Sequence, residues 1–149
     1  MHIKQQLYTE VKNIINNRHQ QITSLINSIQ ESLQSETKSS AGDKHETGRA
    51  MLQLEREKAG NQFAEIERLR QILMRINVKA SSKNVHLGSL VTTNNGVYFI
   101  AIGIGELILN SKSYYVIGLN APIGKLLFGK QKGDEFRLNN KNYQILKVN

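Results

Sequence analysis

A narrow stripe of apolar residues runs through the first 37 residues, and the positions around it are polar. Its members lie three or four residues apart with one interruption at Arg18, and the run holds neither glycine nor proline. This spacing places them along one side of an α-helix, and so narrow a stripe is typical of a coiled-coil seam. The pattern predicts a helix from Ile3 to about Thr37 with its seam at Ile3, Leu7, Val11, Ile14, Ile22, Leu25, Ile29 and Leu33.

A second helical pattern extends from about Glu46 to Val78. Its faces carry a dense mixture of acidic and basic residues, which is typical of solvated helix faces. The apolar residues near its seam are Leu52, Ala59, Phe63, Ile66, Leu69, Leu73 and Ile76. Two helices of similar length joined by a short polar segment are expected to pair antiparallel. We therefore predict a helical coiled-coil hairpin over residues 1–80, with its tip at about residues 39–48.

The hydrophobic period changes to two after a polar linker at residues 80–84, and β-branched residues become frequent. Asn95-Gly96 and Asn139-Asn140 favour tight hairpin turns. Pro122 and Gly129 frame a short helix. The pattern predicts a C-terminal antiparallel β-sheet domain over residues 81–149, with strands at 90–92, 97–102, 106–109, 114–119, 135–138 and 143–148. The predicted fold class is α+β.

The composition of the chain indicates in which cellular compartment the protein works and what kind of partner it binds. The chain has 20 basic and 12 acidic residues, and residues 81–149 alone hold 8 basic against 3 acidic residues. A basic surface favours nucleic acid or an acidic protein partner, and it serves solubility equally well. The absence of cysteine excludes disulfides and thiolate metal sites. No apolar run approaches the roughly 18 residues that a membrane span needs. We expect a monomeric, cytoplasmic protein with no membrane partner.

Two carboxylates three residues apart, Asp43 and Glu46, mark the predicted tip. Spacing alone favours helix capping, because an N-cap Asp with Glu at the third helical position resembles a capping box. The alternative is a site that serves a partner, since the tip lies far from any pocket that a hairpin forms itself. His45 lies between the two carboxylates, but no other His or Cys stands at ligand spacing, which favours a solvated histidine.

Two motifs carry a resemblance to a known family. Gly42-Asp43-x-x-Glu46, with a further acidic residue at Glu55, resembles the acidic tip of the Gre-type bacterial transcript cleavage factors. The segment from Pro122 to Lys130, followed by Gly133-Asp134, resembles the Ser-Pro-x-x-x-x-Leu-x-Gly-Lys…Gly-Asp signature of the same family. The two motifs stand in the family's order and together cover most of the chain.

The resemblance implies a transcription elongation factor that binds RNA polymerase. Its FKBP-like C-terminal domain would dock at the mouth of the polymerase secondary channel, and its hairpin would reach the catalytic centre and the nascent RNA. Asp43 and Glu46 would be the catalytic and metal-binding residues, sharing Mg²⁺ with the polymerase to stimulate cleavage of backtracked RNA. On this view the protein is no enzyme itself but a cofactor of the polymerase's own nuclease activity.

Other functions stay open. Arg49 and Ala50 stand where family members carry an acidic residue and a tyrosine, so the runner-up is a secondary-channel regulator without cleavage stimulation. From a different class, an FKBP-like peptidyl-prolyl isomerase rests on fold analogy alone. A coiled-coil interaction protein is the remaining alternative.

A candidate docking surface follows from the second motif. Pro122 and the basic cluster of Lys125, Lys130 and Lys132 are its predicted partner-binding residues. A solvated loop explains these lysines equally well. Phe128 and the aromatic residues of the predicted strands are assigned mostly to the core of the β domain, with one or two of them on a docking face as the alternative.

Overall fold

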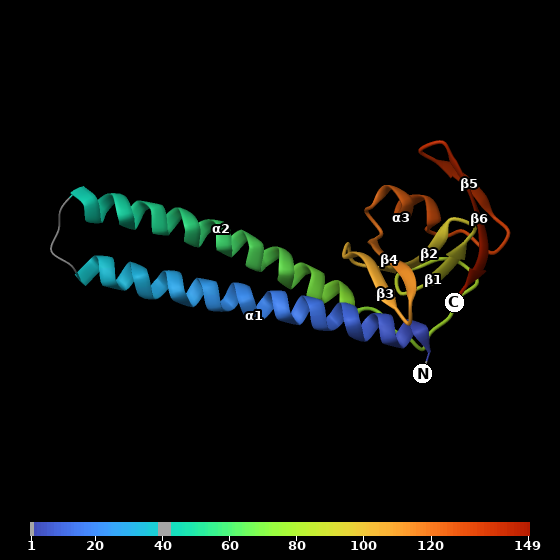
Figure 1. Ribbon diagram of the computed structural model, residues 1–149, viewed down its shortest axis with the longest axis horizontal. Coiled ribbons are helices and arrows are strands. Elements are labelled where there is room, and N and C mark those ends of the chain that lie inside the picture. The colour runs from blue at the N-terminus through green and yellow to red at the C-terminus, as the bar shows by residue number, and fades with distance from the viewer. Residues whose placement is uncertain (1, 39–42) are drawn as a thin grey trace. The chain divides into compact units, whose positions relative to one another are not determined.

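The chain forms two compact units in the computed structural model (Figure 1), which describes residues 2–38 and 43–149 and the side chains of residues 2–36 and 46–149. Residues 13–70 form one unit, called here the helical unit. Residues 1–12 and 71–149 form the other, called the sheet unit. The predicted tip at about residues 39–48 lies partly outside the described residues, and the predicted domain boundary between residues 80 and 81 stays a prediction.

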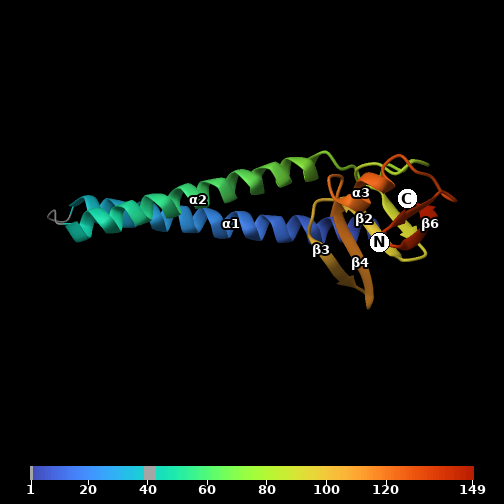
Figure 2. The ribbon, with the colours of Figure 1, turned by 90° about the horizontal axis from the view of Figure 1, so that it is seen from above.

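The helical unit contains most of two long helices, α1 (Ile3–Lys38) and α2 (Asp43–Met74). Both helices were predicted, and in Figures 1 and 2 they run side by side. Within the unit they are antiparallel, because residue 19 of α1 contacts residue 67 of α2 and residue 33 contacts residue 49. Their interface buries Ile22, Ile29 and Ala59, with Ile26, Leu33, Phe63 and Ile66 packed around them.

The seam of α1 agrees with the predicted one at Leu7, Val11, Ile22 and Ile29, which are buried, and departs from it at two positions. Ile15 rather than Ile14 is fully buried, and Leu25 remains 47% exposed. The apparent interruption at Arg18 is filled by His19, whose ring lies 5.4 Å from that of Phe63. Nε2 of His19 also lies 2.8 Å from a carboxylate oxygen of Glu67. Single positions can leave such a stripe, because a 3.5-residue repeat drifts against a 3.6-residue helix.

The sheet unit contains a sheet in the order β3-β4-β2-β1-β6-β5. The strands are β1 (Leu90–Thr93), β2 (Gly96–Ala101), β3 (Gly105–Leu109), β4 (Lys112–Gly118), β5 (Glu135–Leu138) and β6 (Lys141–Val148), and a short helix, α3 (Pro122–Leu127), precedes β5. All six predicted strands and the short helix are present. The sheet is mostly antiparallel as predicted, except that β2 and β4 are parallel. The α+β fold class is confirmed.

The core of the sheet unit is formed by the central strands and α3. Buried residues from β1, β2, β6, α3 and the segment before β1 make one cluster: Val85, Val91, Tyr98, Ile100, Leu127, Tyr143 and Ile145. Phe99 on β2 is also fully buried. Burial raises the pKa of the Tyr98 hydroxyl, with further contributions from Tyr143 and Tyr115. Across the described part of the chain, every helix is too short or too polar to cross a bilayer.

The first turns of α1 belong to the sheet unit. Nζ of Lys4 donates to the carbonyl of Ala80 at 2.9 Å and to that of Asn149 at 3.3 Å. The hydroxyl of Tyr8 donates to the carbonyl of Leu73 at 3.0 Å. These bonds hold segments from both ends of the sequence together.

The second helix ends earlier than predicted. It stops at Met74 instead of Val78, and Ile76 beyond its end is buried against Gly88. The side-chain oxygen of Asn77 accepts from the backbone N–H of Lys79. Asparagine competes with helical hydrogen bonding by such local bonds, which explains why the helical pattern ends before its last apolar residue.

Candidate functional site

The two predicted carboxylates lie in the first turn of α2. The helix begins at Asp43, three residues before the predicted start, so Asp43 and Glu46 both stand where the helix dipole favours negative charge. The side chain of Asp43 lies outside the described residues. The side chain of Glu46 is exposed and has no hydrogen-bond or ion-pair partner among the described groups. A site made by these two residues stays a prediction.

Arg49 and Glu36 connect the two helices close to these carboxylates. Nη1 of Arg49 donates to the carbonyl of Leu33 on α1 at 3.0 Å. The carboxylate of Glu36 lies over Gly48 of α2, 3.7 Å from the position of an added Cβ. Arg49, which departs from the family motif, therefore has a structural role that its sequence position alone does not indicate. Glu36 is a further carboxylate near this end, and its position over Gly48 of the other helix could not be derived from spacing within one helix.

Changing Gly48 to alanine is expected to stabilise the helical unit by about 0.7 kcal/mol, because glycine is a poor residue inside a helix. The contact of 3.7 Å leaves room for a methyl group. Urea unfolding followed by helical circular dichroism measures the change. The reciprocal variant Ala50→Gly, at an exposed position two residues later, should lose about as much. A less stable Gly48→Ala protein would show that Glu36 cannot accommodate the methyl group.

The described residues do not by themselves hold a metal ion. Within residues 2–36 and 46–149, no three His, Asp or Glu side chains lie close enough together to do so. Exposed carboxylates such as Glu46 are suitable ligands for Mg²⁺, which commonly takes one or two carboxylates and completes its shell with water or phosphate. The donor chemistry thus fits Mg²⁺ only if a partner supplies the other ligands.

The predicted docking residues lie on α3 and the segment that follows it. Pro122 is in the first turn of α3 and Lys125 in its last turn, and both are exposed, as is Lys132. Lys130 is half-buried, with Nζ 6.0 Å from the centre of the Phe136 ring. The structure brings these residues into one region of the sheet unit, but their partner-binding role stays a prediction.

Phe128 is a candidate docking residue. The sequence interpretation placed the aromatic residues mostly in the core, with one or two on a docking face, and did not say which ones. The side chain of Phe128 is 56% exposed at the end of α3, whereas Leu127 beside it is fully buried. Adjacent residues on a helix point in different directions, so Leu127 faces the core and Phe128 faces solvent. The apolar pattern of this segment, Leu-Leu-Phe, gives no signal of which residue faces solvent.

The Gly133-Asp134 pair of the second motif has a structural explanation. Gly133 has a φ of 92°, which favours glycine, and its N–H donates to the carbonyl of Ile145. A side-chain oxygen of Asp134 accepts from the backbone N–H of Gln131 at 2.7 Å. The pair therefore builds the turn that leads into β5 and joins it to β6.

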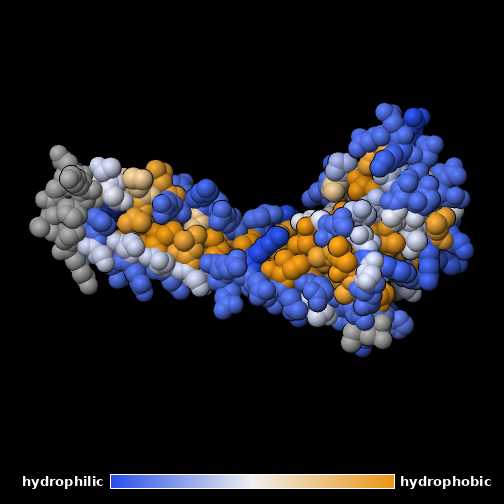
Figure 3. All heavy atoms as spheres, in the orientation of Figure 1, coloured by the Kyte–Doolittle hydropathy of each residue, from blue (hydrophilic) through white to orange (hydrophobic). Residues whose placement is uncertain are grey.

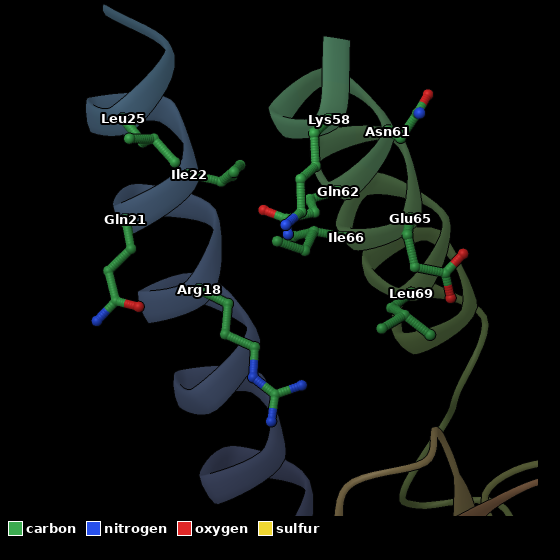
Figure 4. A pocket seen from close by; sticks show the side chains of 10 residues that line it. All are labelled: Arg18, Gln21, Ile22, Leu25, Lys58, Asn61, Gln62, Glu65, Ile66 and Leu69. Atoms are coloured by element: carbon green, nitrogen blue, oxygen red, sulfur yellow. The ribbon is translucent and has the colours of Figure 1, made fainter. Parts of the chain in front are cut away.

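The helical unit also has an apolar groove between its helices, of about 700 Å³. Ile22 and Leu25 of α1 and Ile66 and Leu69 of α2 line it, and polar side chains stand at its edges (Figure 4). In Figure 3 apolar side chains form an exposed strip along the helix pair. Nearer the start of α2, Met51 is 60% exposed. The helix pair thus presents more apolar surface than its own packing covers.

No family model and no curated protein matches this chain. A solved structure described as "Structure of the transcription factor Gfh1" is similar over 87% of this chain and 92% of that one, with 18% sequence identity and a TM-score of 0.35.

Proposed function

We propose that this protein is a transcription elongation factor that binds RNA polymerase and stimulates the polymerase's cleavage of backtracked RNA. The observation that carries the proposal is the position of Asp43 and Glu46 in the first turn of α2, at an end of the antiparallel helix pair. The first turn of a helix is suited to hold carboxylates, and the side chain of Glu46 is open to a partner. The resemblance of the surrounding residues to the Gre-type tip motif supports this function.

In the proposed function Asp43 and Glu46 would help to hold a Mg²⁺ whose other ligands come from the polymerase and the RNA. When bound, such a metal stabilises charge on the oxygens of the phosphodiester and lowers the pKa of a bound water. The protein's own part is to bring two negative oxygen ligands to the polymerase centre on a rigid helix. It therefore acts as a cofactor of the polymerase rather than as an enzyme.

The sheet unit would provide the docking surface. Phe128 presents an exposed aromatic ring, and Lys125 stands three residues before it on α3. Aromatic residues are enriched where protein interfaces bind tightly, and flanking cations favour an acidic partner surface. The uncovered apolar groove of the helical unit is a second surface that polymerase contact would cover.

RNA release from a stalled, backtracked bacterial polymerase tests the proposal. Adding the protein with Mg²⁺ should release short fragments from the 3′ end of the RNA and allow elongation to resume. A protein that binds the polymerase but releases no RNA would be the non-cleaving regulator instead. Failure to bind the polymerase at all would overturn both functions.

The non-cleaving regulator has one observation in its favour. Arg49 stands where the family has an acidic residue, and its guanidinium is bound to the backbone of Leu33, so it adds no carboxylate to the tip. The isomerase alternative finds less support. That function would be supported by an aromatic-lined pocket. The cleft beside Phe136 and Tyr143 is otherwise lined by polar or charged residues. The two rings stack on each other, with their centroids 4.9 Å apart.

A further inference from the structure

The sheet unit contains a second cleft, distinct from the predicted docking residues. Its volume is about 980 Å³. The first turn of α1, residues 78–81, and strands β1, β2, β4 and β6 all contribute to its walls. A cleft that gathers side chains from so many segments is the type of concave site in which small ligands bind.

Four lysines line this cleft, and its lining includes no acidic side chain. Lys4 is only 7% exposed, its Nζ is already held by the carbonyls of Ala80 and Asn149, and burial lowers its pKa. Lys79, Lys112 and Lys147 are exposed, and none of the three side chains has an ion-pair partner among the described residues. Three exposed lysines around one concavity raise the local concentration of anions.

The remaining lining is largely apolar. Leu90, Val97 and Tyr114 come from three neighbouring strands and form the sheet side of the cleft. The first turn of α1, whose N–H groups carry partial positive charge, lies on another side. A ligand that fits this lining combines several negative charges with one flat apolar part.

We propose that this lysine-lined cleft binds a nucleotide that carries two or more phosphate groups. The phosphates contact Lys79, Lys112 and Lys147, and the base packs against the apolar strand residues. Lysine is a common phosphate ligand that acts as a point charge, so three lysines on separate segments suit a phosphate chain. The proposal is independent of the cleavage function, because the cleft uses neither Asp43 nor Glu46.

Isothermal titration calorimetry with the full chain tests this proposal, using ATP without Mg²⁺ at about 50 mM salt. ATP should bind more tightly than AMP, and adenosine should not bind. Tripolyphosphate, which has no base, should bind more weakly than ATP. Raising the salt to about 300 mM should weaken ATP binding, because these lysines are exposed.

Two single variants locate the binding. Lys112→Gln and Lys147→Gln should each weaken ATP binding about tenfold, since each removes one charged hydrogen bond. Lys141→Gln is the matched control: it removes the same charge from the same strand as Lys147, but residue 141 does not line the cleft. Its affinity for ATP should equal that of the unmodified protein.

Three results would overturn the proposal. Equal binding of ATP and AMP would exclude a phosphate-chain site. Equal binding of ATP and tripolyphosphate would exclude a nucleotide and leave an inorganic polyphosphate site. An equal loss in Lys141→Gln would show that overall positive charge, rather than this cleft, attracts the ligand.

Discussion

Changing Asp43 to asparagine is expected to lower RNA cleavage about 100-fold while leaving folding stability almost unchanged. Asparagine caps a helix as well as aspartate does, so loss of a cap cannot explain such an effect. As a metal ligand, however, the neutral amide is much weaker than the carboxylate. Mutating a group that only orients a metal ligand typically lowers metal affinity or activity about 10- to 100-fold. Loss of a ligand itself should therefore lower the cleavage rate about 100-fold.

Glu46→Gln should behave in the same way, because glutamine keeps the role of glutamate in a capping box. Cleavage rates in a backtracked complex across a Mg²⁺ titration provide the measurement, and high Mg²⁺ should partly restore both variants. Glu57→Gln removes one charge from an exposed position of the same helix and should cleave normally. Full activity in Asp43→Asn would assign the motif to helix capping alone.

Changing Gly124 to alanine is expected to destabilise the sheet unit by about 3 kcal/mol. Gly124 is buried in α3, and an added Cβ would lie much too close to the carbonyl oxygen of Gly118 and 3.2 Å from Cα of Leu119. Both contacts are with backbone, so no flexible side chain can move aside. Relief requires α3 to shift and with it Leu127, which is fully buried in the core.

The sheet unit offers both a selective probe and a matched control for this prediction. The protein has no tryptophan, and its five tyrosines, Tyr8, Tyr98, Tyr114, Tyr115 and Tyr143, all belong to the sheet unit. Near-ultraviolet tyrosine signals therefore follow the unfolding of this unit. Gly103→Ala should change stability by less than about 0.5 kcal/mol, since nothing lies within 4 Å of its added Cβ. Equal stability of both variants would contradict the packing of α3.

The long elements were predictable because each has a strong periodic pattern. Both helices and all six strands follow from spacing alone, and Asn139 and Asn140 adopt the positive φ that their turn predicts. The place of His19 in the α1 seam was not predictable, since it depends on the contact of its ring with Phe63 of the other helix. The parallel pairing of β2 with β4 also depends on where β3 lies, which no local pattern specifies.

The candidate site also has features that were predictable from the sequence and features that were not. The spacing of Asp43 and Glu46 already indicated that both belong to a helix start, and α2 begins there. The bond from Arg49 to Leu33 joins two helices and needs knowledge of their register. The lysine-lined cleft joins residues as distant as Lys4 and Lys147, and neither carries a motif. The placement of residues within one helical turn was predictable from the sequence, whereas contacts between distant segments were not.

The bonds from Lys4 to residues 80 and 149 join the two ends of the chain in the sheet unit, and from this we expect an order of folding during synthesis. The sheet unit requires β6 to pair with β1, so it cannot close until the chain has been made to about Val148. The helical unit needs only residues 13–70 and can pair its helices while the ribosome is still making the strands. Once formed, the antiparallel pair holds residues 12 and 71 near each other, and this shortens the loop that the sheet unit must close. We therefore expect the helix pair to form before the sheet unit closes.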